Sequence, residues 1–129
     1  MSRRILAAAL LLVAPLALAA AGTTRRAWVA PAGAAERKNP LESQPDLVTG
    51  GRKVYALRCA NCHGADLGGT KRAPALTDAH VRRRSDGELF WKITSGNTRT
   101  GMPTFSNLPE PQRWQLVLLL RAGMENAPE

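Results

Sequence analysis

Cys59, Cys62 and His63 are the residues of this sequence best able to do chemistry, and they stand together in Cys59-Ala60-Asn61-Cys62-His63. The two cysteines are the only ones in the chain. Two thiols separated by two residues can each add across a vinyl group of a haem, and the adjacent imidazole is then held where it can ligate the iron. This C-x-x-C-H pattern is the attachment signature of a c-type haem. It predicts one covalently bound haem, a cofactor for one-electron chemistry.

A Cys-x-x-Cys pair has three other interpretations. A redox disulfide of the thioredoxin kind belongs in a βαβ pattern, and this chain shows no such alternation. Structural zinc needs four ligands, usually as two separated pairs, and only Cys59, Cys62, His63 and His80 are available. A structural disulfide across two residues would close a very small loop and constrain little of the unfolded chain. The sequence therefore favours haem attachment.

The haem also needs a second axial ligand from a distant part of the chain, because one short motif cannot reach both haem faces. The candidates are Met102, Met124, His80 or an open site. Met102 lies 39 residues after His63 in a Gly-Met-Pro turn, where glycine lets the backbone approach and proline stiffens the turn. Met124 is expected after the last helix, where anchoring is poor, and His80 is expected to face solvent beside a run of arginines. The sequence favours Met102.

A methionine ligand would have a functional consequence. The thioether favours ferrous iron and raises the reduction potential relative to a second histidine. It also closes the iron to oxygen and other small ligands, which suits outer-sphere electron transfer and not substrate turnover. Since no general acid–base pair, nucleophile or phosphate-binding loop is apparent in the sequence, we expect an electron carrier and not an enzyme.

The N-terminal part of the chain has the composition of an export signal. A positively charged start precedes an unbroken apolar run from Ile5 to Ala21, which ends in small residues suited to a signal peptidase. We expect residues 1–21 to be a cleaved signal peptide, with a retained membrane anchor as the alternative. Residues 22–45 are rich in Ala, Pro and Gly and are expected to be a linker. Residues 46–124 are expected to form the haem domain, exported to the periplasm, because such haem is attached outside the cytoplasm.

The charge of the chain restricts its partners. The net charge is +8, and loss of residues 1–21 would leave 16 basic and 10 acidic residues, a net charge of +6. A positive carrier is steered toward acidic protein surfaces or anionic lipid, and nucleic acid is not an expected partner of an exported protein. The cluster Arg82-Arg83-Arg84 is either an ordinary solvated face or part of a docking surface.

The spacing of apolar and turn residues predicts an all-α domain with long loops. Three helices are expected, over residues 43–64, 85–96 and 110–123. The first should begin with Ser43 as its cap and run through the haem motif to Gly64. Ser85 or Asp86 should cap the second, which Gly96 ends. Long loops in a small domain usually have a functional reason, and wrapping a haem is one.

With these residues in hand, the chain resembles the small monohaem cytochromes c of the bacterial His/Met type over residues 46–123. Gly51, Tyr55 and Cys59 follow the G-x-x-x-Y-x-x-x-C spacing of that family, and Pro74-Ala75-Leu76 matches its proline loop. The resemblance implies a cytochrome c fold in which the first and last helices cross at Gly51 and Tyr55 packs at the crossing. It also implies that the Pro74 carbonyl accepts a hydrogen bond from His63 and orients it.

Two departures from the family pattern accompany the resemblance. The last helix has Trp114 but carries Leu119 where the family often has an aromatic, so the crossing must be packed differently. The proline loop reads Ala73-Pro74 where the family often has Gly-Pro.

Together these features predict an exported cytochrome c that shuttles single electrons between redox proteins. Cys59 and Cys62 would attach one haem c, His63 and Met102 would ligate its iron, and Pro74 would orient His63. One alternative is an electron-accepting subunit of a periplasmic dehydrogenase or sulfur-oxidising complex. A second is an open-site haem enzyme or sensor, which requires that Met102 does not bind the iron.

Overall fold

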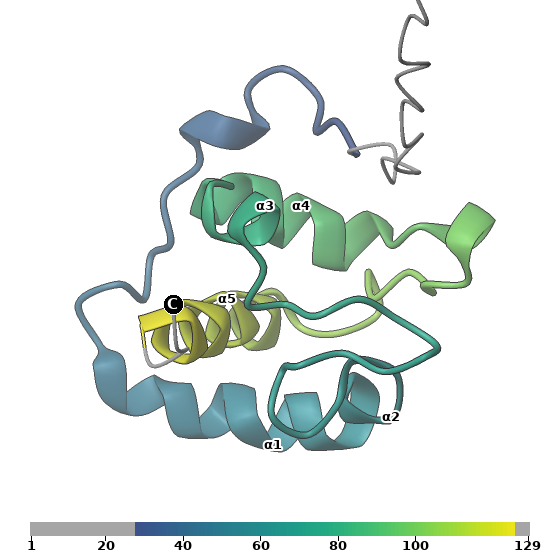
Figure 1. The fold of residues 1–129 in the computed structure, drawn as a ribbon. Helices are drawn as coiled ribbons and strands as arrows, with labels where there is room; N and C mark the ends of the chain where they lie inside the picture. Colours follow the sequence, from purple (N-terminus) through teal and green to yellow (C-terminus); the bar gives the residue numbers. More distant parts are fainter. Residues whose placement is uncertain (1–27, 126–129) are drawn as a thin grey trace, which may run out of the picture.

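The computed structural model describes residues 28–125, so the predicted leader over residues 1–21 lies outside the described part of the chain. The described residues contain helices, short 3-10 turns and loops but no named strand, which confirms the all-α prediction. Figure 1 shows α1 and α5 side by side, with α4 above them. The helices are α1 (Val48–Arg58), α2 (Ala60–His63), α3 (Ala79–Arg82), α4 (Asp86–Ser95) and α5 (Glu110–Glu125), with 3-10 turns η1 (Ala34–Glu36), η2 (Pro45–Leu47) and η3 (Thr98–Thr100).

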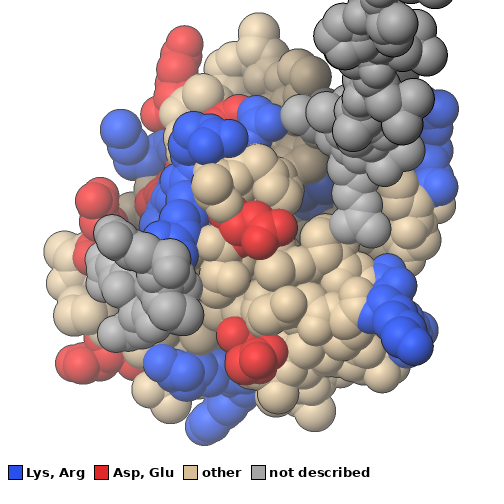
Figure 2. Space-filling view, viewed as in Figure 1, with Lys and Arg blue, Asp and Glu red and all other residues tan. Residues whose placement is uncertain are grey.

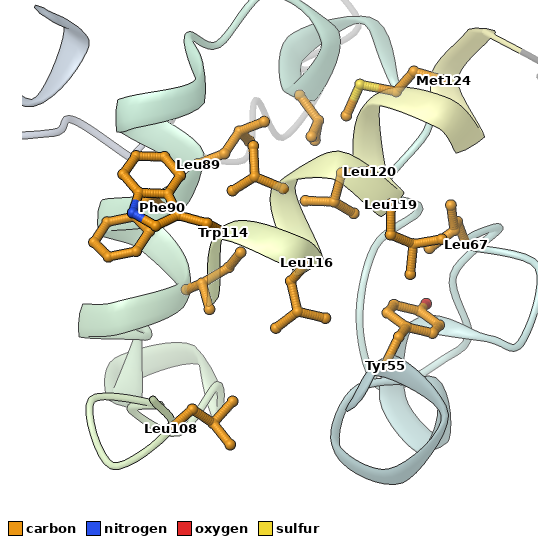
Figure 3. Close-up of a cluster of buried hydrophobic side chains, with 13 residues drawn as sticks. Tyr55, Leu67, Leu89, Phe90, Leu108, Trp114, Leu116, Leu119, Leu120 and Met124 are labelled. Atoms are coloured by element: carbon orange, nitrogen blue, oxygen red, sulfur yellow. The ribbon is translucent and has the colours of Figure 1, made fainter. Parts of the chain in front are cut away.

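The crossing of α1 and α5 depends on Gly51. A Cβ at Gly51 would collide with the backbone carbonyl of Gln115 and would lie 3.3 Å from the Leu119 Cβ. Only a residue without a side chain permits this approach. In Figure 3, Leu119 lies close to Tyr55 beside the crossing, where both are buried. An aliphatic side chain therefore packs where the family that the sequence resembles often has an aromatic one.

A second part of the core joins α4 to α5. The rings of Phe90 and Trp114 stack with centroids 4.0 Å apart. The guanidinium carbon of Arg37 lies 4.5 Å from the centroid of the Phe90 ring, a cation–π contact from the N-terminal side of the domain. Figure 3 shows how α5 links this aromatic pair to the Tyr55 end of the core. The last helix is thus the common support of both halves of the domain.

Residues 28–39, which we call the strap, pack against α4 and α5. Ala34 and Asn39 are 7% and 4% exposed. The Asn39 amide donates to the Trp114 carbonyl over 3.1 Å, and a Cβ at Gly87 would collide with the Ala34 carbonyl. The composition of residues 22–45 predicts a linker. The strap packs through backbone atoms and single side chains instead of a periodic apolar face, so its composition does not reveal the packing.

The helix boundaries correct several expectations. Ser43 does not cap the first helix: Gln44 precedes η2, and no side chain caps either η2 or α1. Residues 39–44 instead form turns of their own, in which the Asn39 carbonyl accepts from Glu42 N and the Leu41 carbonyl from Gln44 N. The helix is also interrupted at Cys59, where φ is −121° and ψ is −37°.

The other helices follow the prediction more closely. Ser85 caps α4 in a reciprocal box with Glu88, and Gly96 follows its end with φ 65°. The short helix α3 was not predicted. The last helix runs to Glu125 and not to Gly123, so the expectation that Met124 lies beyond it is wrong. Met124 is 6% exposed and belongs to the core, because its apolar side chain faces the same cluster as Leu120.

Candidate haem site

The break between α1 and α2 presents the two cysteines. The Cys59 N–H still bonds to the Tyr55 carbonyl, and the Cys59 carbonyl starts the next turn by accepting from the N–H groups of Cys62 and His63. Both thiols are free and half-buried. Burial, and secondarily the neighbouring Cys62, raises the pKa of Cys59 to about 11. Before haem is attached, Cys59 is therefore a protonated thiol at neutral pH.

The ring of His63 has a defined orientation. Its Nδ1 donates to the Pro74 carbonyl oxygen over 2.9 Å. A carbonyl can only accept, so the proton must lie on Nδ1, and Nε2 is the nitrogen left with a lone pair for a metal. This is the contact that the family resemblance implies.

The loop of residues 64–76, which we call the histidine loop, folds back onto the motif. The Gly69 N–H donates to the His63 carbonyl (2.7 Å), and the Thr70 hydroxyl donates to the Cys62 carbonyl (2.6 Å). From α1, the Tyr55 hydroxyl donates to the Gly64 carbonyl over 2.6 Å, and burial raises the pKa of Tyr55 well above its usual range. These bonds fix the backbone that carries the thiols and the imidazole.

The sequence does not reveal Thr70 and Gly69 as site residues. The signal available was weak: the segment reads only as an irregular stretch with glycines. Their role depends on where the loop returns in space, which no local pattern encodes.

Met102 lies on the second long loop, residues 96–109, which we call the methionine loop. The N–H and carbonyl of Met102 pair with the carbonyl and N–H of Asn97, at 3.1 and 2.9 Å. Gly96 has φ 65° and contacts the Pro103 backbone so closely that a Cβ would collide with it. The loop therefore closes into a narrow turn over residues 97–102, and half-buried Met102 stands at the base of that turn opposite Asn97. In Figure 1 this loop and α2 lie at the same end of the molecule.

The other candidate ligands have different surroundings. The His80 side chain is 43% exposed, and its Nδ1 lies 4.0 Å from an oxygen of Asp78, so it faces solvent as predicted. The Met124 sulfur lies 3.9 Å from Nη1 of Arg121 inside the core. Within residues 28–125, no group of three His, Cys, Asp or Glu side chains is arranged to hold a metal ion.

The chemistry of this donor set fits a covalent haem. Cys59 and Cys62 supply two half-buried thiols one helical turn apart, and His63 has one ring nitrogen held and the other left for iron. Half-buried Leu76 and Phe105, one from each loop, pack against the core and offer apolar surface of the kind a porphyrin requires. The helical fold and this motif together define a c-type cytochrome domain.

The chain belongs to the family described as cytochrome C oxidase, cbb3-type, subunit III, whose model matches residues 46–120. It is a cytochrome c domain that carries haem c and functions in electron transfer. A similar curated protein is the Cbb3-type cytochrome c oxidase subunit CcoP of Rubrivivax gelatinosus, which is 41% identical over 107 residues, 80% of this chain and 35% of the relative. This chain spans between 14% and 35% of the length of the curated relatives it matches.

Two solved structures share the fold. Cytochrome CL from the marine methylotroph Methylophaga aminisulfidivorans MPT aligns with a TM-score of 0.56 and 23% identity, covering 64% of this chain and 59% of its own. The c-type cytochrome XoxG from Methylobacterium extorquens AM1 aligns with a TM-score of 0.53 and 30% identity, covering 60% of this chain and 50% of its own. Both likenesses agree with the predicted cytochrome c fold.

The structure gives the cluster Arg82-Arg83-Arg84 a different role from the two considered above. Arg82 donates to the Thr77 carbonyl (2.8 Å). Arg84 pairs with Glu88 (3.0 Å), donates to the Trp28 carbonyl (3.0 Å) and stacks over the Trp28 ring. Two of the three arginines therefore join the domain's own segments, and only Arg83 is exposed.

Basic side chains close to the haem motif are more exposed. Arg58 directly precedes Cys59, and Lys71 and Arg72 follow Thr70, whose hydroxyl binds the Cys62 carbonyl. All three side chains are exposed. Figure 2 shows basic and acidic side chains interspersed over the face that it draws, without one continuous basic patch.

Proposed function

We propose that this chain is an exported monohaem cytochrome c that carries single electrons between redox proteins of the periplasm. The observation that carries the proposal is the hydrogen bond from His63 Nδ1 to the Pro74 carbonyl beside two free thiols, because it leaves Nε2 ready for iron. Cys59 and Cys62 hold the haem, His63 and Met102 ligate iron, and Pro74 orients His63. When bound, the haem supplies a one-electron couple whose potential the axial ligands tune.

The proposal is tested on protein made in a host with haem-attachment machinery. We expect haem absorption that stays with the denatured chain, and a methionine-to-iron charge-transfer band in the ferric form. Met102→Ala should keep the covalent haem, lose that band and bind carbon monoxide in the ferrous form. Native protein that binds carbon monoxide as readily as Met102→Ala would favour the open-site enzyme or sensor.

We further propose that the partner docks on Arg58, Lys71 and Arg72. These exposed side chains border the motif, whereas Arg82 and Arg84 are engaged within the domain. A basic surface beside the haem suits a partner with acidic side chains. Lys71→Glu with Arg72→Glu should slow electron transfer to an acidic redox partner at low salt and lose most of this effect at high salt. Arg83→Glu is the control, because it is exposed but remote in sequence from the motif.

A second candidate is a subunit of a larger oxidoreductase. It is favoured by the relatives, which are named as oxidase subunits and are longer than this chain. Purification of the native protein in mild detergent and at low salt, which preserve complexes, tests it. Stoichiometric co-purification with a large catalytic subunit would support the subunit, and a haem protein that purifies without any partner would support the carrier.

The location follows from residues 1–21. Cleavage after this segment would release the domain into the periplasm, and retention would anchor it to the membrane. Among residues 28–125, none of the helices has both the length and the apolar character that a bilayer span requires. The mass of the mature haem protein distinguishes the cleaved from the anchored form.

A further inference from the structure

Arg113 joins three parts of the domain with one side chain. It lies in the first turn of α5, just after the methionine loop ends. Its Nε donates to the Leu108 carbonyl over 3.1 Å, and its Nη1 donates to the Thr94 hydroxyl over 2.6 Å. The guanidinium carbon lies 4.8 Å from the centroid of the Phe90 ring. The side chain thus ties α5 to the end of the loop and to the last turn of α4.

Thr94 is where this tie meets the backbone of the methionine loop. The Thr94 carbonyl accepts from the Phe105 N–H over 3.2 Å, and its hydroxyl both accepts from Arg113 and donates to the Phe90 carbonyl over 2.8 Å. The exit of the loop is therefore held at Phe105 and again at Leu108. Its entrance is held at Gly96, and Met102 lies between these points.

We infer that Arg113 is a positioning residue for the methionine ligand: it closes the base of the methionine loop and so limits how often Met102 leaves the iron. The inference rests on the proposed ligation by Met102. Arg113 lies at the loop base and acts only through the backbone between Phe105 and Leu108. A guanidinium suits this task because its planar fork can donate in two directions at once.

Arg121 offers a matched control on the same helix. It bonds to Asp86 (2.7 Å) and to the Arg82 and Arg84 carbonyls. Like Arg113, it is a half-buried arginine that ties α5 to other segments. Its partners lie at or just before the start of α4, whereas the partner of Arg113, Thr94, lies at the end of α4. Its loss should destabilise the domain without opening the methionine loop.

The test compares Arg113→Gln with Arg121→Gln in the haem-loaded protein. The readouts are the rate of carbon monoxide binding to the ferrous form, the intensity of the methionine-to-iron band and the reduction potential. Arg113→Gln should speed carbon monoxide binding about tenfold, as loss of two hydrogen bonds would, weaken the band and lower the potential. Arg113→Lys should restore part of each effect, and Arg121→Gln should change none beyond its effect on global stability.

Thr94→Val provides a second variant if Arg113→Gln does not fold, because it removes the shared hydroxyl and keeps the side-chain shape. It should change the same readouts in the same direction. Equal changes in the Arg113 and Arg121 variants, or no change in Arg113→Gln and Thr94→Val, would overturn the role of Arg113. If Met102→Ala also leaves the band and the carbon monoxide rate unchanged, then the ligation by Met102 is itself wrong.

Discussion

The histidine loop and the methionine loop are held in different ways. The histidine loop bonds to the ligand segment itself, through the Gly69 N–H, the Thr70 hydroxyl and the Pro74 carbonyl. The backbone of Met102 pairs with Asn97 of its own loop, and the ties to α4 and α5 lie at the loop base. The segment of the proposed ligand His63 is thus held by bonds from another part of the chain, whereas Met102 pairs with Asn97 of its own loop. The methionine loop should therefore open before the histidine loop does when the protein is perturbed.

The largest expected difference separates the two ligands. His63→Gly should abolish the native haem spectrum, because it removes the ligand next to the thioether bonds and the hydrogen bond to Pro74. Met102→Ala should keep a histidine-ligated haem with a lower potential. Absorption spectra and potentiometric titration of both variants measure this. A native-like spectrum in His63→Gly would show that His63 does not ligate the iron.

Substitution at the helix crossing should damage both loops alike. Gly51→Ala places a methyl group against the Gln115 carbonyl, and overpacking of this kind costs about 2–3 kcal/mol. Since α1 and α5 support both loops, the unfolding midpoint in denaturant should fall without a preferential loss of the methionine band.

Gly50→Ala is the matched control for this prediction. A Cβ at Gly50 meets only the end of the flexible Gln115 side chain, which can move, and alanine favours the helix by up to about 1 kcal/mol over glycine. The free energy of unfolding should therefore fall for Gly51→Ala and stay level or rise for Gly50→Ala. Equal losses in both would mean that the crossing is not the tight point.

A pair of threonines tests the two loops against each other. Thr70 and Thr100 are both exposed, and each donates its hydroxyl to a nearby backbone carbonyl, of Cys62 (2.6 Å) and Asn97 (3.1 Å) respectively. Each change to valine should cost about 1 kcal/mol or less. We expect Thr100→Val to speed carbon monoxide binding slightly and Thr70→Val to leave it unchanged. The opposite order would contradict the comparison.

Acid should loosen the start of α4 and, through it, the methionine loop. The pKa of Glu88 is lowered first by its bond to the Ser85 backbone and then by Arg84. A lowered folded-state pKa means that Glu88 stabilises the domain above its unfolded pKa of about 4.3. This stability is lost as the pH falls through the folded-state pKa. Glu88→Gln should flatten the fall of stability below about pH 5, measured by denaturant unfolding at several pH values, whereas exposed Glu42→Gln should follow the native curve.

The features that could be predicted from the sequence are those written in short, local patterns. Cys59, Cys62 and His63 predict haem attachment because the reaction itself demands that spacing. Ser85 with Glu88 predicts the start of α4 because a capping box closes within one turn. Gly51 was predicted as a crossing point only through the family resemblance, since the glycine pattern alone does not say which helix comes close.

The features that could not be predicted depend on which distant segments of the chain fold back against one another. The break in the helix at Cys59 could not be predicted, because Arg58 and Ala60 on either side of it are good helix formers. The strap reads as a linker because it is rich in Ala, Gly and Pro, and its contacts come from single residues such as Asn39, which leave no periodic pattern. Met124 was placed outside the core because a glycine precedes it, although α5 continues past that glycine to bury it.

The sequence by itself determined the cofactor and the class of protein, because covalent haem attachment needs only five consecutive residues. It also made Met102 the preferred ligand, because that residue stands in a stiff turn at a suitable distance along the chain. Only the tertiary structure decided what holds each loop: backbone bonds at the histidine, and Thr94 with Arg113 at the base of the methionine loop. Such ties join residues far apart in the chain, and their hydrogen bonds exist only once α1, α4 and α5 have packed.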